Sequence, residues 1–221
     1  MFYDKYFRGF KSFTEETPMA VEKSLKKAKE LKTADEGDYY EFGLYKGYTF
    51  WYAQNIAQKI NLEKMRFFGF DSFKGLPEIV GIDKTKNGFY KGQFSYSENK
   101  LKQNLESFGV SWSKTFVING FFQDTLVSST KKDYDMNKVS VALIDCDLYH
   151  STVKVLEFLK DMLLDKSILI FDDWNCFGDE KKGEQYAFNE FLKKNKEIRP
   201  TEFFSYHKEN YGKVFILDIN P

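Results

Sequence analysis

Short apolar runs alternate with amphipathic helical segments from residue 38 onward, and this alternation constrains the fold more than any other feature of the chain. Strand-like runs separated by helices are typical of a parallel sheet that helices cover on both faces. The predicted strands are Asp38–Phe42, Met65–Phe70, Lys114–Ile118, Val139–Ile144, Ser167–Phe171, Thr201–Tyr206 and Lys213–Asp218. The predicted helices are Thr14–Leu31, Gly47–Ile60, Ser97–Phe108, Ser151–Leu164 and Gly183–Lys194.

The last two predicted strands are separated only by His207 to Gly212, which suits a hairpin. A hairpin reverses the chain, so the final strand is expected to run antiparallel to the others. We therefore predict an α/β, Rossmann-like fold: a mostly parallel seven-stranded sheet with an antiparallel last strand and helices on both faces. Residues 72–93 show no periodicity and are expected to form a loop, and His207 is expected to be exposed to solvent.

Charge and cysteine content exclude several classes of protein. The chain has 33 basic and 33 acidic residues, without the basic stripe of a nucleic-acid-binding protein. Its two cysteines, Cys146 and Cys176, cannot form a disulfide framework, and with only two histidines the composition argues against a zinc site rich in His or Cys. No run approaches the roughly 20 apolar residues of a membrane helix, and no signal peptide is recognised. These features indicate a cytoplasmic protein that binds neither nucleic acid nor membranes.

Acidic residues follow four of the predicted strands, at the sheet edge where open α/β sheets bind their ligands. Any one of them could serve as a helix cap or a turn residue, because Asp favours both places. Four strand ends that each carry an acid favour a binding site instead. The residues are Glu41, Asp71, Asp145 with Asp147, and Asp172 with Asp173.

The segment from Glu41 to Gly47 connects a predicted strand to a predicted helix, and Gly43 lies within it. Glycine lets a ligand approach the backbone closely. The three-glycine fingerprint of nicotinamide dinucleotide sites is missing, and Glu41 would repel a phosphate but attract a methionine amino group. Asp71, after the next strand, can accept both hydroxyls of a ribose. The pattern predicts a nucleoside ligand without a pyrophosphate.

Asp145, Asp172 and Asp173 follow two strands that are expected to be neighbours. Three carboxylates so placed can enter one coordination shell, and hard oxygen ligands select Mg²⁺, Ca²⁺ or Mn²⁺. A cation there could hold a substrate hydroxyl and lower its pKa. An Asp-Asp pair alone is often a solvated turn, so this prediction depends on Asp145 converging with the pair.

Several longer motifs occur between residues 41 and 192. Residues 68–78 read FGFDSFKGLPE, and residues 144–152 read IDCDLYHST. Together with residues 92–95, 120–126 and 171–174, these segments resemble the signatures of the macrocin O-methyltransferase family.

The resemblance implies a class I methyltransferase fold that uses S-adenosylmethionine and a divalent cation, Mg²⁺ or Mn²⁺, to methylate a sugar hydroxyl. Asp145, Asp172 and Asp173 would hold the metal, and Asp145 would also act as the general base or assist it. The positions implied for the cofactor are Glu41 and Gly43 at the methionine end, Asp71 at the ribose, and Gly47, Ser72, Gly120 and Asp145 around them.

The chain departs from the family pattern in two places. After Asp-x-Asp-x-Tyr the family commonly has Glu, where this chain has His150. The exchange is either neutral at a helix start or places a titratable group near the substrate, so His150 joins Asp145 as a candidate catalytic residue. Residues 1–36 match no motif, and we expect a helical extension, a possible substrate lid, before a methyltransferase domain spanning residues 37–221.

Three other functions stay open. Asp145-Cys146-Asp147 also fits the D-x-D motif with which glycosyltransferases bind metal and nucleotide-sugar phosphates, although Glu41 and Asp71 would then have no role. A catechol-type methyltransferase would share the metal site but take a flat phenolic acceptor, and a non-catalytic module could keep the cofactor pocket. The expected substrate is a small-molecule or nucleotide-linked sugar in a bacterial polysaccharide or metabolite pathway. The expected assembly is a homodimer or a higher homo-oligomer.

Overall fold

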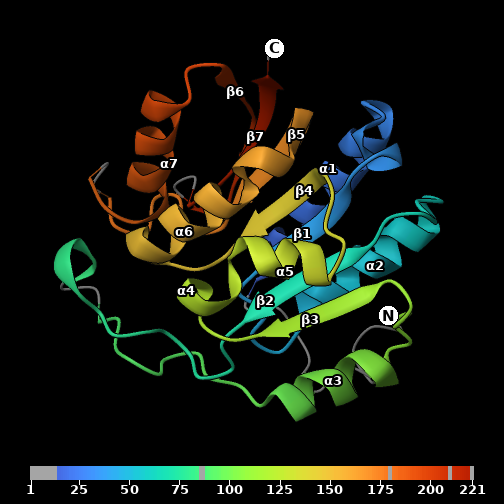
Figure 1. Ribbon diagram of the computed structural model, residues 1–221, viewed down its shortest axis with the longest axis horizontal. Helices are drawn as coiled ribbons and strands as arrows, with labels where there is room; N and C mark the ends of the chain where they lie inside the picture. The colour runs from blue at the N-terminus through green and yellow to red at the C-terminus, as the bar shows by residue number, and fades with distance from the viewer. Residues whose placement is uncertain (1–13, 85–87, 179–180, 209–210, 220–221) are drawn as a thin grey trace.

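Seven strands form a single sheet in the order β3-β2-β1-β4-β5-β7-β6 (Figure 1). The computed structural model describes residues 14–84, 88–178, 181–208 and 211–219. β7 pairs antiparallel with both of its neighbours, and the other pairs are parallel, which confirms the predicted sheet. The strands are β1 Asp38–Phe42, β2 Phe67–Asp71, β3 Thr115–Asn119, β4 Val139–Ile144, β5 Leu163–Phe171, β6 Ile198–Tyr206 and β7 Gly212–Ile219.

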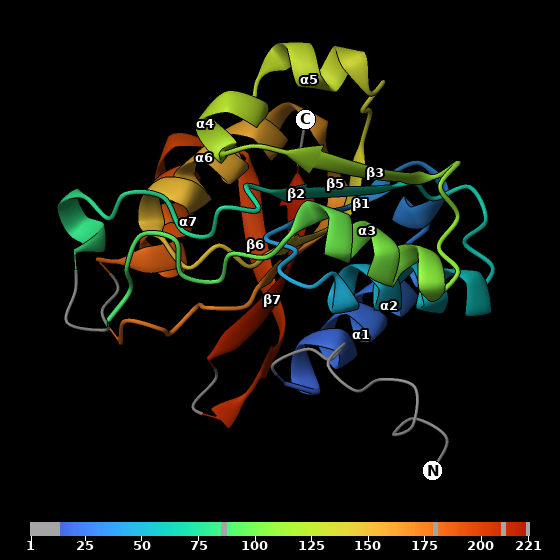
Figure 2. The same ribbon diagram turned by 90° about the horizontal axis from the view of Figure 1, so that it is seen from below.

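Helices cover both faces of the sheet, with α1, α2 and α3 on one face and α4 to α7 on the other (Figure 2). Within the described ranges, none of them combines the length and the apolar character that crossing a membrane requires. The α-helices are α1 Glu16–Glu30, α2 Tyr48–Lys59, α3 Glu98–Ser107, α4 Phe122–Thr125, α5 Ser128–Asp133, α6 Tyr149–Leu159 and α7 Gly183–Lys194. Short 3₁₀ turns are η1 Thr33–Asp35, η2 Gly81–Asp83 and η3 Lys160–Met162.

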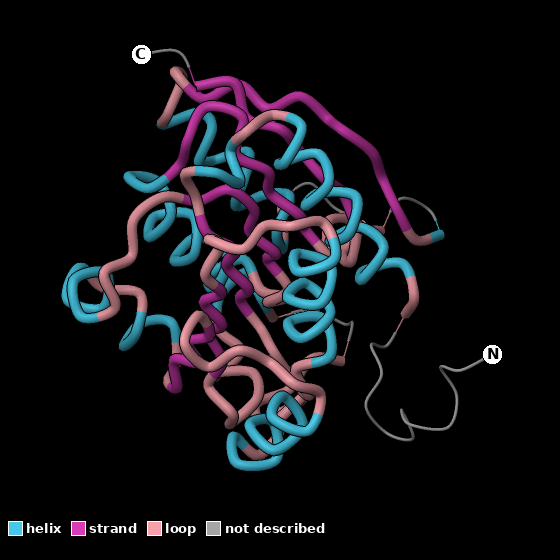
Figure 3. The backbone as a smooth tube through the Cα atoms, turned by 90° about the vertical axis from the view of Figure 1, so that its right-hand side faces the viewer, coloured by secondary structure: helices cyan, strands magenta, loops and turns pink. Residues whose placement is uncertain are grey.

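Strands β1 and β4, at the centre of the sheet, are covered by helices on both faces, as Figure 3 shows. Successive side chains of a strand point to opposite faces. In β1, Tyr39 packs in the layer of α1 and α2, whereas Tyr40 packs in the layer of α6 and α7. Every residue of β1 and β4 is buried, including Glu41. The polar groups of these strands therefore concentrate where the strands end.

Helix α1 is part of the helical layer on the sheet. Val21 and Leu25 are fully buried in the same cluster as Val141 and Leu143 of β4. The expected amino-terminal extension thus contributes core residues to the domain. Residues 1–13 lie outside the described residues, and the role of residues 1–36 as a lid stays a prediction.

The structure differs from the sequence-based prediction in two regions. The helix expected to reach Leu164 ends at Leu159, and β5 begins at Leu163 rather than Ser167. Between them the chain turns through η3, and the side chain of Ser167 accepts a hydrogen bond from the backbone N–H of Leu164 at 2.7 Å. Helices α4 and α5, which the prediction missed, have four and six residues, too few for a helical repeat to show.

Leu25→Ala tests whether α1 is part of the core. Leu25 is fully buried, so the truncation should lower the free energy of unfolding by about 2–5 kcal/mol. The matched control Lys26→Ala, an exposed position of the same helix, should stay within about 0.5 kcal/mol. Denaturant unfolding monitored by circular dichroism measures both, and equal stabilities would contradict the packing of α1.

Candidate functional site

A cavity of about 710 Å³ opens at the carboxyl ends of β1, β2, β4 and β5. All but one of the site residues expected from the sequence line it, although they come from distant parts of the chain. They are Glu41, Gly43, Asp71, Ser72, Gly120, Asp145, His150, Asp172 and Asp173. Gly47 is the exception: it is buried at the start of α2 and faces Leu101 of α3.

Gly43 marks the closest approach of two strand ends around the cavity. Its φ is +96°, and a Cβ at this position would lie 1.9 Å from the carbonyl oxygen of Asp145. No larger side chain fits without moving the loop that carries Asp145. Gly47, with φ of +83°, then turns the chain into α2. The two glycines therefore shape the loop after β1, and Gly43 also fixes its distance from the loop after β4.

Asp71 is held by the backbone of two loops. Its Oδ2 accepts hydrogen bonds from the N–H groups of Leu44 at 2.8 Å and Tyr45 at 3.0 Å, and its Oδ1 accepts one from Phe73 at 2.6 Å. Burial raises the pKa of Asp71, while these N–H donors act against that rise. A carboxylate has about four acceptor positions, so capacity remains for a ligand hydroxyl. Ser72 stabilises the turn that follows, donating to the carbonyl of Gly75 at 2.9 Å.

Glu41 is a buried carboxyl group in β1 whose side chain borders the cavity. Its Oε2 accepts a hydrogen bond from the hydroxyl of Tyr39 at 2.6 Å. Burial, with a smaller contribution from the charges of Asp172 and Asp71, raises the pKa of Glu41 to about 8. A cationic ligand group beside it would favour the ionised form.

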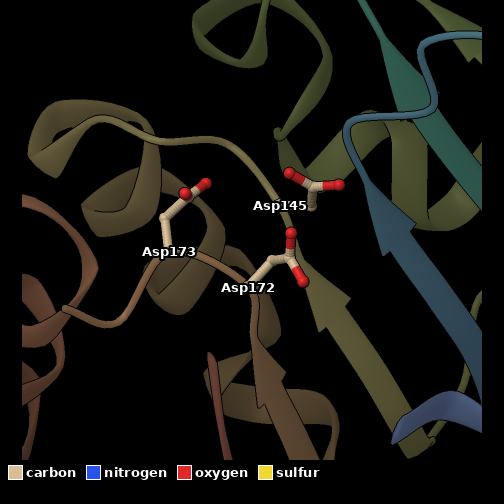
Figure 4. A group of neighbouring side chains, drawn as sticks. All are labelled: Asp145, Asp172 and Asp173. Atoms are coloured by element: carbon tan, nitrogen blue, oxygen red, sulfur yellow. The ribbon is translucent and has the colours of Figure 1, made fainter. Parts of the chain in front are cut away.

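Asp145, Asp172 and Asp173 form the metal-binding candidate. Each offers one oxygen, and these oxygens all lie within 4.8 Å of one another. Figure 4 shows Asp145 after β4, with Asp172 and Asp173 after the neighbouring β5. Burial, then repulsion from the neighbouring carboxylates, raises the pKa of Asp145 and of Asp173 well above the usual range. Clustered hard oxygen donors with excess negative charge fit a cation such as Mg²⁺ or Mn²⁺.

Two further carboxyl groups surround this cluster. Burial and the charge of Asp172 raise the pKa of Asp147, which has a left-handed φ of +59°, to about 7. Glu184, fully buried in the first turn of α7, accepts hydrogen bonds from the N–H of Asp173 at 3.0 Å and of Cys146 at 3.4 Å. Sequence analysis missed Glu184 because a glutamate in the first turn of a helix is ordinarily an exposed residue.

His150 borders the cavity from the first turn of α6, and its side chain is 54% exposed. Its Nδ1 lies 2.6 Å from Oδ2 of Asp83, a buried residue of η2. Asp83 also accepts hydrogen bonds from the N–H groups of Tyr149 and His150, so it caps α6 and anchors η2 to the start of that helix. In the tautomer that fits this contact, Nδ1–H donates to the carboxylate of Asp83, and Nε2 is the available ring nitrogen. A catalytic role for His150 stays a prediction.

The expectation that His207 is exposed to solvent is wrong. Only 11% of its side chain is exposed, because the end of β6 folds against the first turn of α1. Its Nδ1 lies 2.7 Å from Glu16 and its Nε2 lies 3.2 Å from the hydroxyl of Thr17. A hydrogen bond with Asp172 is the main cause that raises the pKa of His207.

The family model described as macrocin-O-methyltransferase (TylF) matches residues 21–201, most of the chain. The chain belongs to the macrocin O-methyltransferase family. This confirms the resemblance seen in the sequence motifs. The matched range covers the four carboxylate-bearing strand ends and most of α1.

A curated member of similar sequence is the 8-demethyl-8-(2,3-dimethoxy-alpha-L-rhamnosyl)-tetracenomycin-C 4'-O-methyltransferase of Streptomyces olivaceus. It is 26% identical over 144 residues, which are 62% of this chain and 53% of that protein, so the chain spans about half the length of this relative. Among solved structures, the O-methyltransferase NovP has a TM-score of 0.72 at 18% identity, covering 91% of this chain and 80% of that one. The calicheamicin methyltransferase CalS11 has a TM-score of 0.69 at 19% identity, covering 90% and 79%. These two structures share the fold.

In the absence of a divalent cation, Glu41→Gln should stabilise the protein relative to wild type. The gain in stability should increase as the pH rises. The pKa of Glu41 is about 8 in the folded protein and 4.5 in the unfolded chain, so the unfolded chain loses this proton at lower pH. The contribution of Glu41 to wild-type stability therefore falls as the pH rises from 4.5 to 8. Gln cannot ionise. The melting temperature of the variant minus that of wild type, measured in EDTA, should therefore grow from pH 5 to pH 8.

Glu22→Gln is the control for this titration. Glu22, half-buried on α1, has a lowered pKa, mainly from its hydrogen bond with Lys26, so both folded and unfolded forms are ionised above pH 5. Its difference from wild type should stay nearly constant over the same range. A constant difference for Glu41→Gln as well would show that Glu41 ionises normally.

Proposed function

We propose that this chain transfers the methyl group of S-adenosylmethionine to a hydroxyl of a sugar, with the help of a divalent cation. The observation that carries the proposal is the meeting of Asp145, Asp172 and Asp173 in a cavity that Glu41 and Asp71 also line. Family membership supports the methyl-transfer chemistry.

The loop between β1 and α2 would hold the cofactor. Glu41 faces the cavity from β1 and would attract the ammonium group of the methionine part. Gly43 removes a side chain where the cofactor must approach the backbone. Asp71, fixed by three N–H donors, would accept a ribose hydroxyl, while Ser72 and Gly120 border the same cavity.

Asp145, Asp172 and Asp173 would hold the divalent cation. The cation would offset their mutual repulsion and, when bound, would polarise an acceptor hydroxyl and lower its pKa. Asp145 lies where the loops after β1 and β4 meet, so it is the residue placed between the cofactor loop and the acidic cluster. We assign it as the group that takes the hydroxyl proton or assists that transfer.

The reaction is a displacement at the methyl carbon: the acceptor oxygen forms the new bond, the carbon–sulfur bond breaks, and the hydroxyl proton leaves through Asp145. The sulfonium charge disappears, which leaves little new charge for the protein to stabilise. Positioning of the two reactants and removal of the proton therefore supply most of the acceleration. His150, oriented by Asp83 beside the cavity, is the second proton acceptor within the proposal.

A glycosidic or nucleotide-linked sugar is the proposed acceptor, since the relative from Streptomyces olivaceus is named for methylation of a rhamnosyl group. The D-x-D glycosyltransferase alternative leaves Glu41 and Asp71 without a role and does not agree with the family. A catechol-type acceptor is compatible with the same carboxylates, and activity on catechols but not on sugars would favour it.

Asp145→Ala should reduce methyl transfer by at least about 10²-fold, because the variant lacks both a metal ligand and the proposed proton acceptor. Affinity for S-adenosylhomocysteine should stay close to that of wild type. A radiolabelled methyl-transfer assay on nucleoside diphosphate sugars and glycosides, with calorimetry for binding, measures both. Asp161→Ala, an exposed position of η3, is the matched control and should leave both quantities unchanged.

Excess EDTA should abolish methyl transfer, and Mg²⁺ or Mn²⁺ should restore it, because hard divalent cations suit an all-carboxylate donor set. S-adenosylhomocysteine should raise the melting temperature, whereas nucleoside diphosphates should not. Wild-type turnover in EDTA would exclude the metal from the mechanism. Stabilisation by nucleoside diphosphates alone would support the glycosyltransferase alternative.

A further inference from the structure

The carboxylate of Asp172 is hydrogen-bonded on one side only. Its Oδ1 accepts a hydrogen bond from the hydroxyl of Thr17 at 2.8 Å and another from the hydroxyl of Tyr206 at 2.9 Å. Among the described residues, no hydrogen bond reaches its Oδ2. The two hydroxyl groups, with Nε2 of His207 3.6 Å from the same Oδ1, thus fix the orientation of this side chain and leave Oδ2 available.

The two donors come from different parts of the chain. Thr17 lies in the first turn of α1, 155 residues before Asp172, and Tyr206 is the last residue of β6. Both are almost completely buried, with exposed fractions of 3% and 4%. Neither belongs to a motif that the sequence analysis connected with the acidic cluster.

Both hydroxyl groups are themselves held in place. The hydroxyl of Thr17 lies 3.1 Å from that of Thr14 and 3.2 Å from Nε2 of His207. The ring of Tyr206 lies so close to Gly212 that a Cβ there would be 2.3 Å from it, and its hydroxyl also lies 3.2 Å from the carbonyl of Phe171. Rigid donors of this kind hold a metal ligand more firmly than solvent does.

We propose that Thr17 and Tyr206 are positioning residues of the metal centre, and that helix α1 is thereby a structural part of it. By occupying Oδ1 they fix the carboxylate of Asp172 so that Oδ2 is free to coordinate a cation together with Asp145 and Asp173. The inference rests on the proposed function, because it requires a cation at these three residues. The inference goes beyond the proposed function by assigning a role to two residues that are not metal ligands themselves.

Thr17→Val and Tyr206→Phe test the inference, since each removes one hydroxyl and keeps most of the side-chain volume. Each should weaken Mn²⁺ binding by about 10- to 100-fold, the usual effect of losing a hydrogen bond to a metal ligand. Calorimetric titration of the full chain with Mn²⁺ measures the affinity. The affinity of both variants for S-adenosylhomocysteine, measured in EDTA, should equal that of wild type. Thr17→Ser, which keeps the hydroxyl, should bind Mn²⁺ like wild type.

Matched controls remove the same kinds of hydrogen bond elsewhere. Tyr52→Phe loses a hydroxyl that donates to Glu22 at 2.6 Å, and Thr201→Val loses one that donates to Asp218 at 3.2 Å. Both should bind Mn²⁺ like wild type. If they lose affinity as much as Thr17→Val and Tyr206→Phe do, the effect is one of general stability and the inference is overturned.

Asp172→Asn separates this inference from the proposed function. If Asp172→Asn binds Mn²⁺ like wild type, the proposed metal site is wrong. If Asp172→Asn loses Mn²⁺ affinity while Thr17→Val and Tyr206→Phe retain it, the metal site stands and the positioning role is wrong. Loss of affinity in all three variants, with the controls unchanged, supports both.

Discussion

Buried negative charge at the carboxyl ends of β1, β4 and β5 is the constraint on which the rest of the site depends. Burial and mutual repulsion raise the pKa of several of these carboxyl groups, which shows how unfavourable the arrangement is without a cation. The free energy that brings them together comes from the apolar sheet and its two helical layers. The groups whose pKa is raised are those of Glu41, Asp145, Asp147, Asp173 and Glu184, and the carboxyl group of Asp172 lies among them.

Hydrogen-bond donors stabilise these groups, and several of the donors come from elements that are far apart in sequence from the carboxyl group. Tyr39 donates to Glu41 within β1, and backbone N–H groups of two loops donate to Glu184. Thr17 and Tyr206 donate to Asp172 from α1 and β6. Hydrogen-bonded carboxylates tolerate burial better than isolated ones. The same bonds fix the orientation of the side chains, so the arrangement that makes the acidic cluster tolerable also prepares it for a cation.

Sequence analysis predicted the sheet, its antiparallel last strand and most helix bounds, because strand and helix periodicities persist over many residues. It did not predict α4 and α5, which are shorter than two helical turns. It placed Asp71 and Asp145 at strand ends, which is a local property of the chain. It could not place Glu184 or His207, since their burial arises from contacts with residues distant in sequence. No local pattern encodes such contacts.

The amino-acid sequence by itself determined which residue types lie at the ends of four strands: acids at the ends of β1, β2, β4 and β5, and a glycine where the backbone must turn after β1. These are properties of neighbouring residues, and the physics of strands and turns acts on neighbours. Only the tertiary structure decided which of these acids meet, how closely Gly43 approaches Asp145, and that α1 reaches Asp172. Those distances result from packing both faces of the sheet at once, a condition that involves the whole chain.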